Sequence, residues 1–548
     1  MTYNIRKIMM IAATVAITAG ANAQTVQDGI KMYQYKKFKS AQRILEPLAA
    51  TDAQANYYFG LSLLDAGNTT RANEVFSKFP EDPANISGTI RVAYATKNAA
   101  KGLQIAKDLA AKSKKKEWIQ TKYAAEGMAY SDGGDANQAI AWYKDIMAKN
   151  KEVFEKTEDA NIHIGMGDTY RRIAGGGGDA MSNYEHVTEK DPNNSLGYTR
   201  IGDLWYDARN YSSALDNYSK AKDADPNNPL PYKSLANAYS RSGKYQQALT
   251  NLKKYYQLCD STLADKRLYV EGLFLAQSNC DASKFAQELL KTENLTNEFK
   301  VELYGILGFS MADCGDSMQA LNYTRQYFQM QDPKNIKPAD YIQYGKLFIK
   351  VNMLDSAGYY YAKGIAGDTA QNKTDIYRQI AEAYKSKKDY CKSGDWYNNL
   401  IKANPETQPS DYAWRGIMYW YCKDYNKAMD AFNDFAGKYP DQNSAYFWQG
   451  RTQMAIDSEA TSGAAVPYFM KWLNNVGGDS YEKKNDLKGV YEYLLYYFYN
   501  KKDKENLNLY KEKILKIDPN DKGVHDIEEM EKAGAAPKKA PAPAKPKK

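Results

Sequence analysis

The feature that most constrains this chain is a set of side chains that recurs after 34 residues, and residues 195–258 show it most clearly. The first copy consists of Tyr198, Ile201, Gly202, Trp205, Ala214, Tyr218 and Ala221. The second copy consists of Tyr232, Leu235, Ala236, Tyr239, Ala248, Leu252 and Tyr255. Self-similarity with this period is typical of helix–turn–helix units stacked in series.

The spacing within one copy explains why such units stack. Offsets of three and four place Tyr198, Ile201 and Trp205 on one helical face, with Gly202 where a second helix has to approach closely. Ala214 and its neighbours form the matching stripe on that second helix. Neither helix covers its stripe alone, so each pair needs neighbours. We therefore predict an all-α, right-handed solenoid superhelix of about fourteen helix–turn–helix units, covering nearly all of residues 25–520.

The register also varies along the chain. Residues 86–113 look helical but fit the pattern poorly, which indicates a degenerate third unit. One extra residue is expected at the four glycines 175–178, and a longer turn around residues 461–465. The glycine run lacks the Gly-Lys-Ser/Thr ending of a phosphate loop, so a turn between helices is the better interpretation.

One copy carries a family resemblance. Residues 198–226 match the pattern aromatic-x2-aliphatic-Gly-x2-aromatic, with Ala twelve residues after the Gly and Pro twelve residues further on. On these positions the chain resembles the tetratricopeptide repeat proteins. The resemblance implies that the first helix of each pair lines a concave groove that accepts extended peptides or partner helices.

The resemblance also implies which residues bind the partner, namely Arg171, Asp203, Tyr206, Lys233, Asn237, Arg241, Arg378, Trp420 and Tyr421. Lys233 and Asn237 match the first two residues of the family's clamp for C-terminal carboxylates. Gly305 occupies a position that a later clamp residue would need, which argues against such a clamp. Trp420 and Tyr421 are expected as an exposed aromatic anchor, with ordinary packing between repeats as the alternative.

The two ends of the chain differ from its body. Residues 1–23 have the form of a secretory signal, with Arg6 and Lys7 before an apolar run that is too short to span a bilayer. The expected organisation is a signal peptide at 1–23, N-terminal repeats at 24–260, C-terminal repeats with a capping helix at 261–531, and a disordered Lys/Ala/Pro tail at 532–548. No later segment is apolar for long enough to cross a membrane.

The net charge of +8 resides in these ends. Residues 1–23 and 532–548 hold eight Lys or Arg residues and no acid, so the body between them is neutral. Nucleic-acid capture depends on clustered positive charge, and we therefore expect no nucleic-acid partner.

Catalytic signatures are weak. The three histidines, His163, His186 and His525, show no metal-ligand spacing, and no nucleophile elbow or Cys-x-x-Cys occurs. We expect no enzyme activity, no cofactor and no metal. A hydrolase with an unrecognised site, tested by mutating His163, is the alternative.

The five cysteines follow an export signal, in a compartment that permits disulfides. In the repeat frame, Cys391 opens the second helix of one unit and Cys422 ends the first helix of the next, and Cys280 and Cys314 are similarly related. We predict Cys391–Cys422 and Cys280–Cys314 bridges between successive repeats, with separate buried thiols as the alternative. Cys259 is left over.

Together these observations predict a non-enzymatic scaffold in the bacterial periplasm that binds other proteins or peptides along its groove. A part in envelope assembly, secretion or surface-organelle machinery is an analogy from the fold class. A peripheral position at the outer membrane is one option. The alternative function is an envelope tether whose groove aromatics and basic tail hold cell-wall or carbohydrate material.

Overall fold

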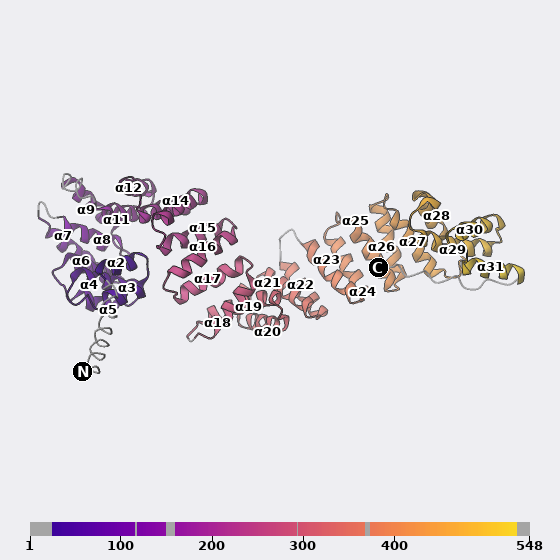
Figure 1. Cartoon of the computed structure of the whole chain (residues 1–548), viewed down its shortest axis with the longest axis horizontal. Coiled ribbons are helices and arrows are strands. Elements are labelled where there is room, and N and C mark those ends of the chain that lie inside the picture. The colour runs from indigo at the N-terminus through magenta and orange to yellow at the C-terminus, as the bar shows by residue number, and fades with distance from the viewer. Residues whose placement is uncertain (1–24, 115–117, 150–158, 293, 368–372, 534–548) are drawn as a thin grey trace, which may run out of the picture. The chain divides into compact units, whose positions relative to one another are not determined.

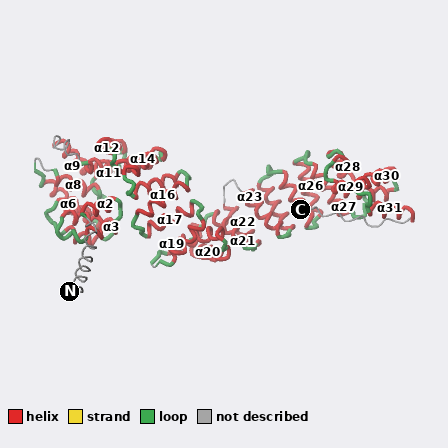
Figure 2. Tube along the Cα trace, in the orientation of Figure 1, coloured by secondary structure: helices red, strands yellow, loops and turns green. Residues whose placement is uncertain are grey.

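The computed structural model describes residues 25–114, 118–149, 159–292, 294–367 and 373–533. Within these residues the chain forms α-helices, three short 3-10 helices and turns, with no strand (Figure 2). The α-helices that the structure describes form fourteen successive pairs followed by a single helix. The prediction of an all-α solenoid of about fourteen helix–turn–helix units is thereby confirmed.

The chain divides into two compact units, residues 1–286 and 287–548, which we describe separately (Figure 1). The first unit contains α2 (Val26–Gln34), α3 (Phe38–Leu45), α4 (Ala53–Asp65), α5 (Thr69–Phe76), α6 (Pro83–Ala95), α7 (Ala99–Ala111), α8 (Ile119–Ala129), α9 (Ala136–Lys149), α11 (Ala160–Tyr170), α12 (Gly177–Lys190), α13 (Ser195–Asp207), α14 (Tyr211–Ala224), α15 (Pro229–Arg241), α16 (Tyr245–Leu258) and α17 (Leu263–Leu275). Helix α18 (Asn279–Leu290) contains the point of division.

The second unit continues the same alternation. It contains α19 (Asn297–Ser310), α20 (Ser317–Met330), α21 (Pro338–Lys350), α22 (Leu354–Gly367), α23 (Lys373–Ser386), α24 (Tyr390–Ala403), α25 (Pro409–Tyr421), α26 (Tyr425–Lys438), α27 (Asn443–Ile456), α28 (Val466–Asn475), α29 (Lys484–Lys501), α30 (Lys504–Ile517) and α31 (Lys522–Ala533). The 3-10 helices are η1 (Met311–Cys314), η2 (Pro333–Asn335) and η3 (Gly478–Ser480).

Side-chain caps mark where most helices begin. The first backbone N–H groups of a helix have no partner within it, and a preceding Asp, Asn or Thr oxygen accepts their hydrogen bonds. Asp52 and Asn68 cap the two helices of the second repeat in this way, and Asn194 and Asn210 cap those of the sixth. The turn residues therefore help to determine where each helix of the repeat begins.

In several repeats a glycine on the first helix lies directly against a large ring on the second helix. A Cβ placed on Gly202 would lie 2.6 Å from Cδ1 of Tyr218, and one on Gly416 would lie 2.4 Å from Cε1 of Phe432. The same contact joins Gly60 to Phe76, Gly167 to Tyr184, Gly345 to Tyr361 and Gly450 to Phe469. The extra residue at 175–178 and the longer turn at 461–465 both lie between the two members of such a contact.

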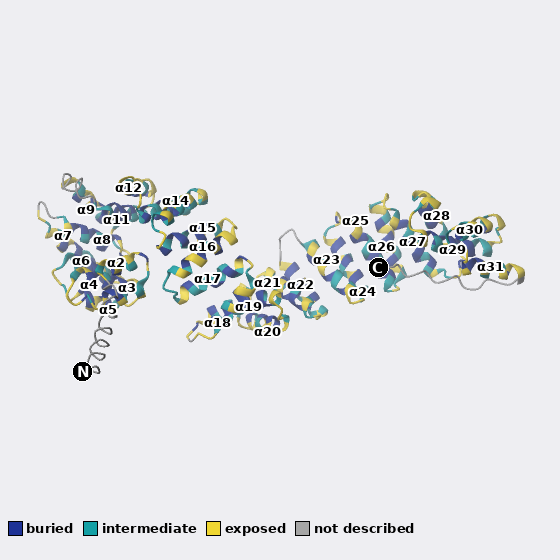
Figure 3. Cartoon of the chain, viewed as in Figure 1, coloured by how far each residue is buried: buried dark blue, intermediate teal, exposed yellow. Residues whose placement is uncertain are grey.

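Contacts between repeats show which side of the stack is concave. Neighbouring first helices touch one another, as α4 and α6, α6 and α8, and α13 and α15 do in the first unit, and α25 and α27 in the second. Among the described helices, no contact of similar extent joins two neighbouring second helices. A stack that is closer along one side curves toward that side, so the first helices line the inner face of each unit. Buried positions run along the helices within the stack, and exposed positions occupy the turns and the outward faces of helices such as α5 and α7 (Figure 3).

Two details differ from the sequence-based expectation. The third repeat, expected to be degenerate, is a regular pair formed by α6 and α7. Helix α31 runs to Ala533, so Lys532, the first residue of the expected tail, is helical. Residues 1–24 and 534–548, and with them the signal peptide and the rest of the tail, lie outside the described residues.

We predict that Gly202→Ala and Gly416→Ala each lower the stability of the fold by about 1–3 kcal/mol, because the added methyl group overlaps a buried ring. The matched control is Gly437→Ala in α26, where a Cβ meets nothing within 4 Å. Removing that glycine's backbone freedom should leave stability equal or raised by about 0.5–1 kcal/mol. Thermal unfolding followed by circular dichroism measures all three. Equal midpoints for Gly202→Ala and Gly437→Ala would show that the close approach is not a constraint.

Candidate functional site

The inner face of the first unit carries a continuous series of polar side chains, which we call the inner ladder. Its members come from the first helices and their ends, and they are Asp65, Arg91, Lys122, Glu126, Tyr130, Asp159, Asp168, Arg171, Arg200, Asp203, Tyr206, Asp207 and Arg241. The acidic and basic members alternate across neighbouring repeats. Because the helices of successive repeats approach closely here, most members have a partner on the next repeat.

Asp168 in α11 lies at the centre of the ladder. Its carboxylate accepts hydrogen bonds from the hydroxyl of Tyr184 at 2.7 Å and from that of Tyr130 at 3.2 Å. Arg200, one repeat further on, places Nε 2.7 Å from the same carboxylate. Three groups, from the end of α8, from α12 and from α13, therefore converge on one acid and connect three successive repeats.

Asp203 in α13 repeats this arrangement one step along the chain. It accepts a hydrogen bond from Tyr218 at 2.9 Å and pairs with Arg171 at 3.4 Å. Arg171 also reaches Asp207 at 2.6 Å. Burial raises the pKa of Asp203, although Arg200 and the Tyr218 hydroxyl act in the opposite direction. Asp203 and Arg171, two of the predicted binding residues, are thus already paired with each other, whereas the Asp207 side chain is 60% exposed.

A second buried group lies around Glu126 in α8. The Nζ of Lys122 lies 3.7 Å from Glu126 and forms a closer ion pair with Asp159, the N-cap of α11. Burial raises the pKa of Glu126 to about 7, because the proximity of Lys122 offsets only part of the cost of removing the carboxylate from water. The rings of Tyr57 and Tyr123, packed 5.7 Å apart, lie in the same part of the face.

The remaining predicted residues of the first unit lie on α13 and α15. Arg241 is exposed and donates from Nε to the Tyr206 hydroxyl at 3.3 Å. Asn237 is exposed on the same helix, and the Nζ of Lys233 lies 5.3 Å from the centre of the Tyr255 ring. The structure therefore brings Tyr206 and Arg241 together and leaves Asn237 facing solvent.

In the second unit the predicted site residues have a different environment. Arg378 donates two hydrogen bonds to Asp411, at 2.9 and 2.8 Å, and a third to Asp375 at 2.7 Å. Asp411 is buried, and burial opposes the lowering of its pKa that Arg378 and Thr407 cause. Arg378 thus links α23 to α25 through its hydrogen bonds to Asp411.

The expected exposure of Trp420 is wrong. Its side chain is only 8% exposed, and its ring packs 5.6 Å from that of Trp448 with the Arg451 guanidinium 5.1 Å above it. The last turn of α25 presents this position to the neighbouring α27 rather than to solvent, so the packing alternative applies. Tyr421 is half-buried, with its ring 5.1 Å from that of Tyr390.

One predicted disulfide is present with its expected partners. Cys391 and Cys422 are bonded, with their Cα atoms 5.1 Å apart, and join the second helix of one repeat to the end of the first helix of the next. Cys280 and Cys314 are also disulfide-bonded; that they bond each other stays a prediction. Cys259 is the free thiol among the described cysteines.

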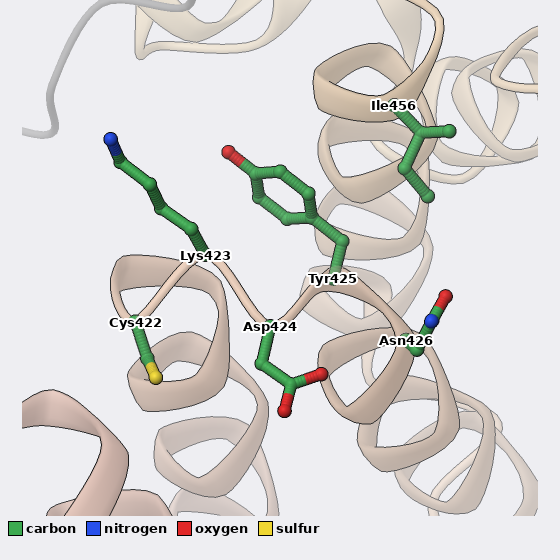
Figure 4. A pocket seen from close by; sticks show the side chains of 6 residues that line it. All are labelled: Cys422, Lys423, Asp424, Tyr425, Asn426 and Ile456. Atoms are coloured by element: carbon green, nitrogen blue, oxygen red, sulfur yellow. The ribbon is translucent and has the colours of Figure 1, made fainter.

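The hollow beside this disulfide does not form a convergent site. It has a volume of about 440 Å³ and is lined by Cys422, Lys423, Asp424, Tyr425, Asn426 and Ile456. The Asp424 and Cys422 side chains extend away from those of Lys423 and Tyr425 (Figure 4). Asp424 caps α26 through the backbone N–H of Lys427 at 3.1 Å. These residues serve the turn rather than a ligand.

The histidines show one contact that the sequence did not suggest. The rings of His163 and His186 lie 4.2 Å apart, and Nδ1 of His163 lies 3.0 Å from Oδ1 of Asn183. His163 is buried between α11 and α12. The described residues contain no group of three or more His, Cys, Asp or Glu side chains placed to hold a metal ion. No described helix is long and apolar enough to cross a membrane.

Several ladder members escaped the sequence analysis, notably Asp168, Arg200, Lys122 and Glu126. One signal was available. An acid directly follows the repeat glycine in Gly167-Asp168 and Gly202-Asp203, and the tyrosine 15 or 16 residues later donates to it. Glu382 and Tyr397 make the same contact in the second unit. The recurrent acid could therefore have been identified from the repeat alone.

Comparison with known proteins adds little. No family model and no curated protein matches the chain. The C-terminal part of a TPR repeat-containing protein from Cytophaga hutchinsonii matches at 24% identity and a TM-score of 0.34, over 48% of this chain and 98% of that one. A tetratricopeptide repeat protein from Parabacteroides merdae matches at 15% identity and a TM-score of 0.29, over 48% and 98%. The APC/C Cut9–Hcn1 hetero-tetramer matches at 14% identity and a TM-score of 0.28, over 92% of this chain and 94% of that one.

These likenesses are too low to bear on function. The structure itself shows helix–turn–helix repeats with the 34-residue period, because α13 begins at Ser195 and α15 at Pro229, and the glycine-to-ring contact recurs in several pairs.

We predict that Glu126→Gln stabilises the protein above neutral pH and has little effect in acid. The folded-state pKa of about 7 exceeds the ordinary value of 4.5, so folding is penalised when Glu126 is ionised. This penalty is absent below the unfolded pKa and grows as the pH rises toward the folded pKa, reaching at most about 3 kcal/mol. Glutamine carries no charge, so the substitution removes this penalty. The gain in thermal midpoint over wild type should therefore appear between about pH 5 and about pH 8.

The control for this prediction is Asp216→Asn, which removes an exposed carboxylate from an ion pair with Lys220 in α14. Exposed pairs of this kind contribute less than about 1 kcal/mol, so the control should show no comparable dependence on pH. A Glu126→Gln variant that is less stable than wild type both at about pH 5 and at about pH 8 would mean that the ionised carboxylate supports the fold.

Proposed function

We propose that the protein is a non-enzymatic scaffold that binds extended segments of partner proteins along the inner face of its repeats. The observation that carries this proposal is the inner ladder. Its side chains are held in position by partners on neighbouring repeats, so a ligand would meet a face that is already ordered and would lose little affinity to side-chain ordering. Stacked repeats of this kind create the extended concave surfaces that repeat proteins use for binding.

The chemistry of the ladder favours a polypeptide partner. Acidic and basic groups alternate along the face, which suits a segment with mixed charge and main-chain hydrogen-bonding groups rather than a polyanion. Asn237 and Arg241 are exposed, and Tyr130 is 42% exposed although its hydroxyl reaches Asp168. These groups are available to a ligand without breaking the buried ion pairs that join the repeats.

The proposed location is the periplasm, after removal of residues 1–23. The support is the sequence of that segment, together with cysteines that are bonded in pairs of the kind an oxidising compartment permits. An envelope assembly, secretion or surface-organelle complex is the proposed setting of the partner.

We predict that a photo-crosslinking amino acid at Asn237 yields adducts of discrete mass in living cells, whereas the same amino acid at Gln247 does not. Both positions are exposed and belong to one repeat, but Asn237 lies on the first helix and Gln247 on the second. Mass spectrometry identifies the trapped segment. Equal labelling at the two positions, or none at Asn237, would remove the support for binding at the inner face.

We also predict that the protein purified from its own cells begins at Gln24, because Ala21 and Ala23 provide the small residues that precede signal cleavage. Intact-mass measurement of the periplasmic fraction tests this. A chain deleted for residues 2–23 should remain in the cytoplasm, and its appearance in the periplasm would contradict the export proposal.

A further inference from the structure

The first repeat touches the turns that follow the sixth and the seventh repeat. The hydroxyl of Tyr35, at the end of α2, donates to Asp225 in the turn between α14 and α15. The Nζ of Lys31 lies 3.9 Å from the same carboxylate. Tyr35 is only 6% exposed, although it belongs to the first repeat described.

A second contact supplies a cap that α3 lacks locally. Lys37 precedes α3 and makes no side-chain cap. Instead Asp260, in the turn between α16 and α17, accepts hydrogen bonds from the backbone N–H groups of Lys39 at 2.8 Å and Ser40 at 3.2 Å. It also accepts one from the Ser40 hydroxyl at 2.6 Å. These two amides are the second and third of the helix, which an N-cap residue normally satisfies, and the negative charge suits that end of the helix dipole.

These contacts, which we call the clasp, consist of Lys31, Tyr35, Lys39, Ser40, Asp225 and Asp260. They mean that the first unit curves through one full turn in seven repeats, so that its beginning meets its own later turns. The inner ladder lies on the concave side of this turn. Access to it along the whole face therefore depends on whether the turn is closed.

The clasp differs in kind from the contacts within the stack. Within the stack, glycine-to-ring contacts are buried, whereas the clasp consists of polar groups at the ends of α2 and α3 and in two later turns. In the clasp Tyr35 is buried, Lys39 is exposed, and Ser40 and Asp260 are half-buried. A hydrogen bond to a carboxylate shifts an equilibrium by about tenfold or more. Opening the clasp breaks these polar contacts and leaves the buried contacts within every repeat in place, whereas unfolding a repeat breaks the buried contacts as well.

A sequence comparison within the chain supports a special role for Asp225. The turn Asp-Pro-Asn-Asn occurs at residues 191–194 and again at residues 225–228. Asp191 accepts from the backbone N–H of Asn193 at 3.0 Å, and Asp225 accepts from that of Asn227 at 3.2 Å. The two turns thus share their local geometry. Asp225 alone of the two aspartates also holds Tyr35.

We propose that the clasp is a latch that holds the N-terminal unit closed and opens without unfolding any repeat, so that the inner ladder alternates between an enclosed and an accessible state. The opening itself needs no partner. Its effect on access by a partner rests on the proposed function.

The test places two dyes on the full chain, through Arg43→Cys and Lys254→Cys, and measures energy transfer in single molecules. Both side chains are exposed, on α3 and α16 respectively. Cys259→Ser removes the free thiol, and the other four cysteines are disulfide-bonded. The clasp variant is Asp225→Asn with Asp260→Ala. The matched control is Asp191→Asn, which alters the same turn where no clasp exists.

We expect the clasp variant to increase the low-transfer population by about tenfold or more, with unchanged helicity, and the control to match wild type. An unchanged low-transfer population would overturn the latch. So would a low-transfer state that appears together with lost helicity, because the first repeat would then be unfolding rather than separating.

Crosslinking at Asn237 separates this proposal from the proposed function. If the clasp variant opens and its adducts at Asn237 increase, both proposals are supported. If it opens and no adduct forms in either protein, the latch stands and binding at the inner face fails.

Discussion

The structure depends on the contact between a residue without a side chain and a ring on the following helix. Where Gly202 faces Tyr218, or Gly416 faces Phe432, the two helices of a repeat approach so closely that no other residue fits without a shift. The ring then fills the space beneath the first helix. Where the ring is Tyr184 or Tyr218, its hydroxyl also donates to a carboxylate on the inner face, so that one residue serves both packing and polar contacts.

This arrangement connects the core to the inner face. Tyr184 and Tyr218 are buried, yet their hydroxyls position Asp168 and Asp203 where arginines of the next repeat can reach them. Buried charges are costly unless they are paired, and the ladder pairs most of them between repeats. Glu126 is the exception, because Lys122 is engaged more closely by Asp159 and leaves that carboxyl with a raised pKa. The second unit follows the same packing rule with a more aromatic inner face around Arg451.

The repeat, its count and its capping helix could be predicted from the sequence because they depend on short-range periodicity. The exposure of Trp420 could not, because whether a residue at the end of a first helix meets solvent depends on the neighbouring repeat, here on Trp448 and Arg451. The contact between His163 and His186 joins the two helices of one repeat and depends on how their side chains pack. The clasp at Asp260 joins positions that periodicity relates only after the curvature of the whole unit is known. The acid after the repeat glycine was predictable in principle, since it recurs at a fixed position.

The Cys391–Cys422 bond has a consequence for how this chain comes apart. In a linear array each repeat is stabilised only by its neighbours, so melting starts at an end and advances one unit at a time. The disulfide joins two neighbouring repeats covalently and closes a loop with a sequence separation of 31. Melting that advances along the array therefore stops at this junction. A front moving inward from the C-terminus would halt at the eleventh and twelfth repeats while the bond is intact. Under reducing conditions the bond would be broken and melting would continue past this junction. The resistance of this part of the array to progressive unfolding therefore depends on the redox state of Cys391 and Cys422.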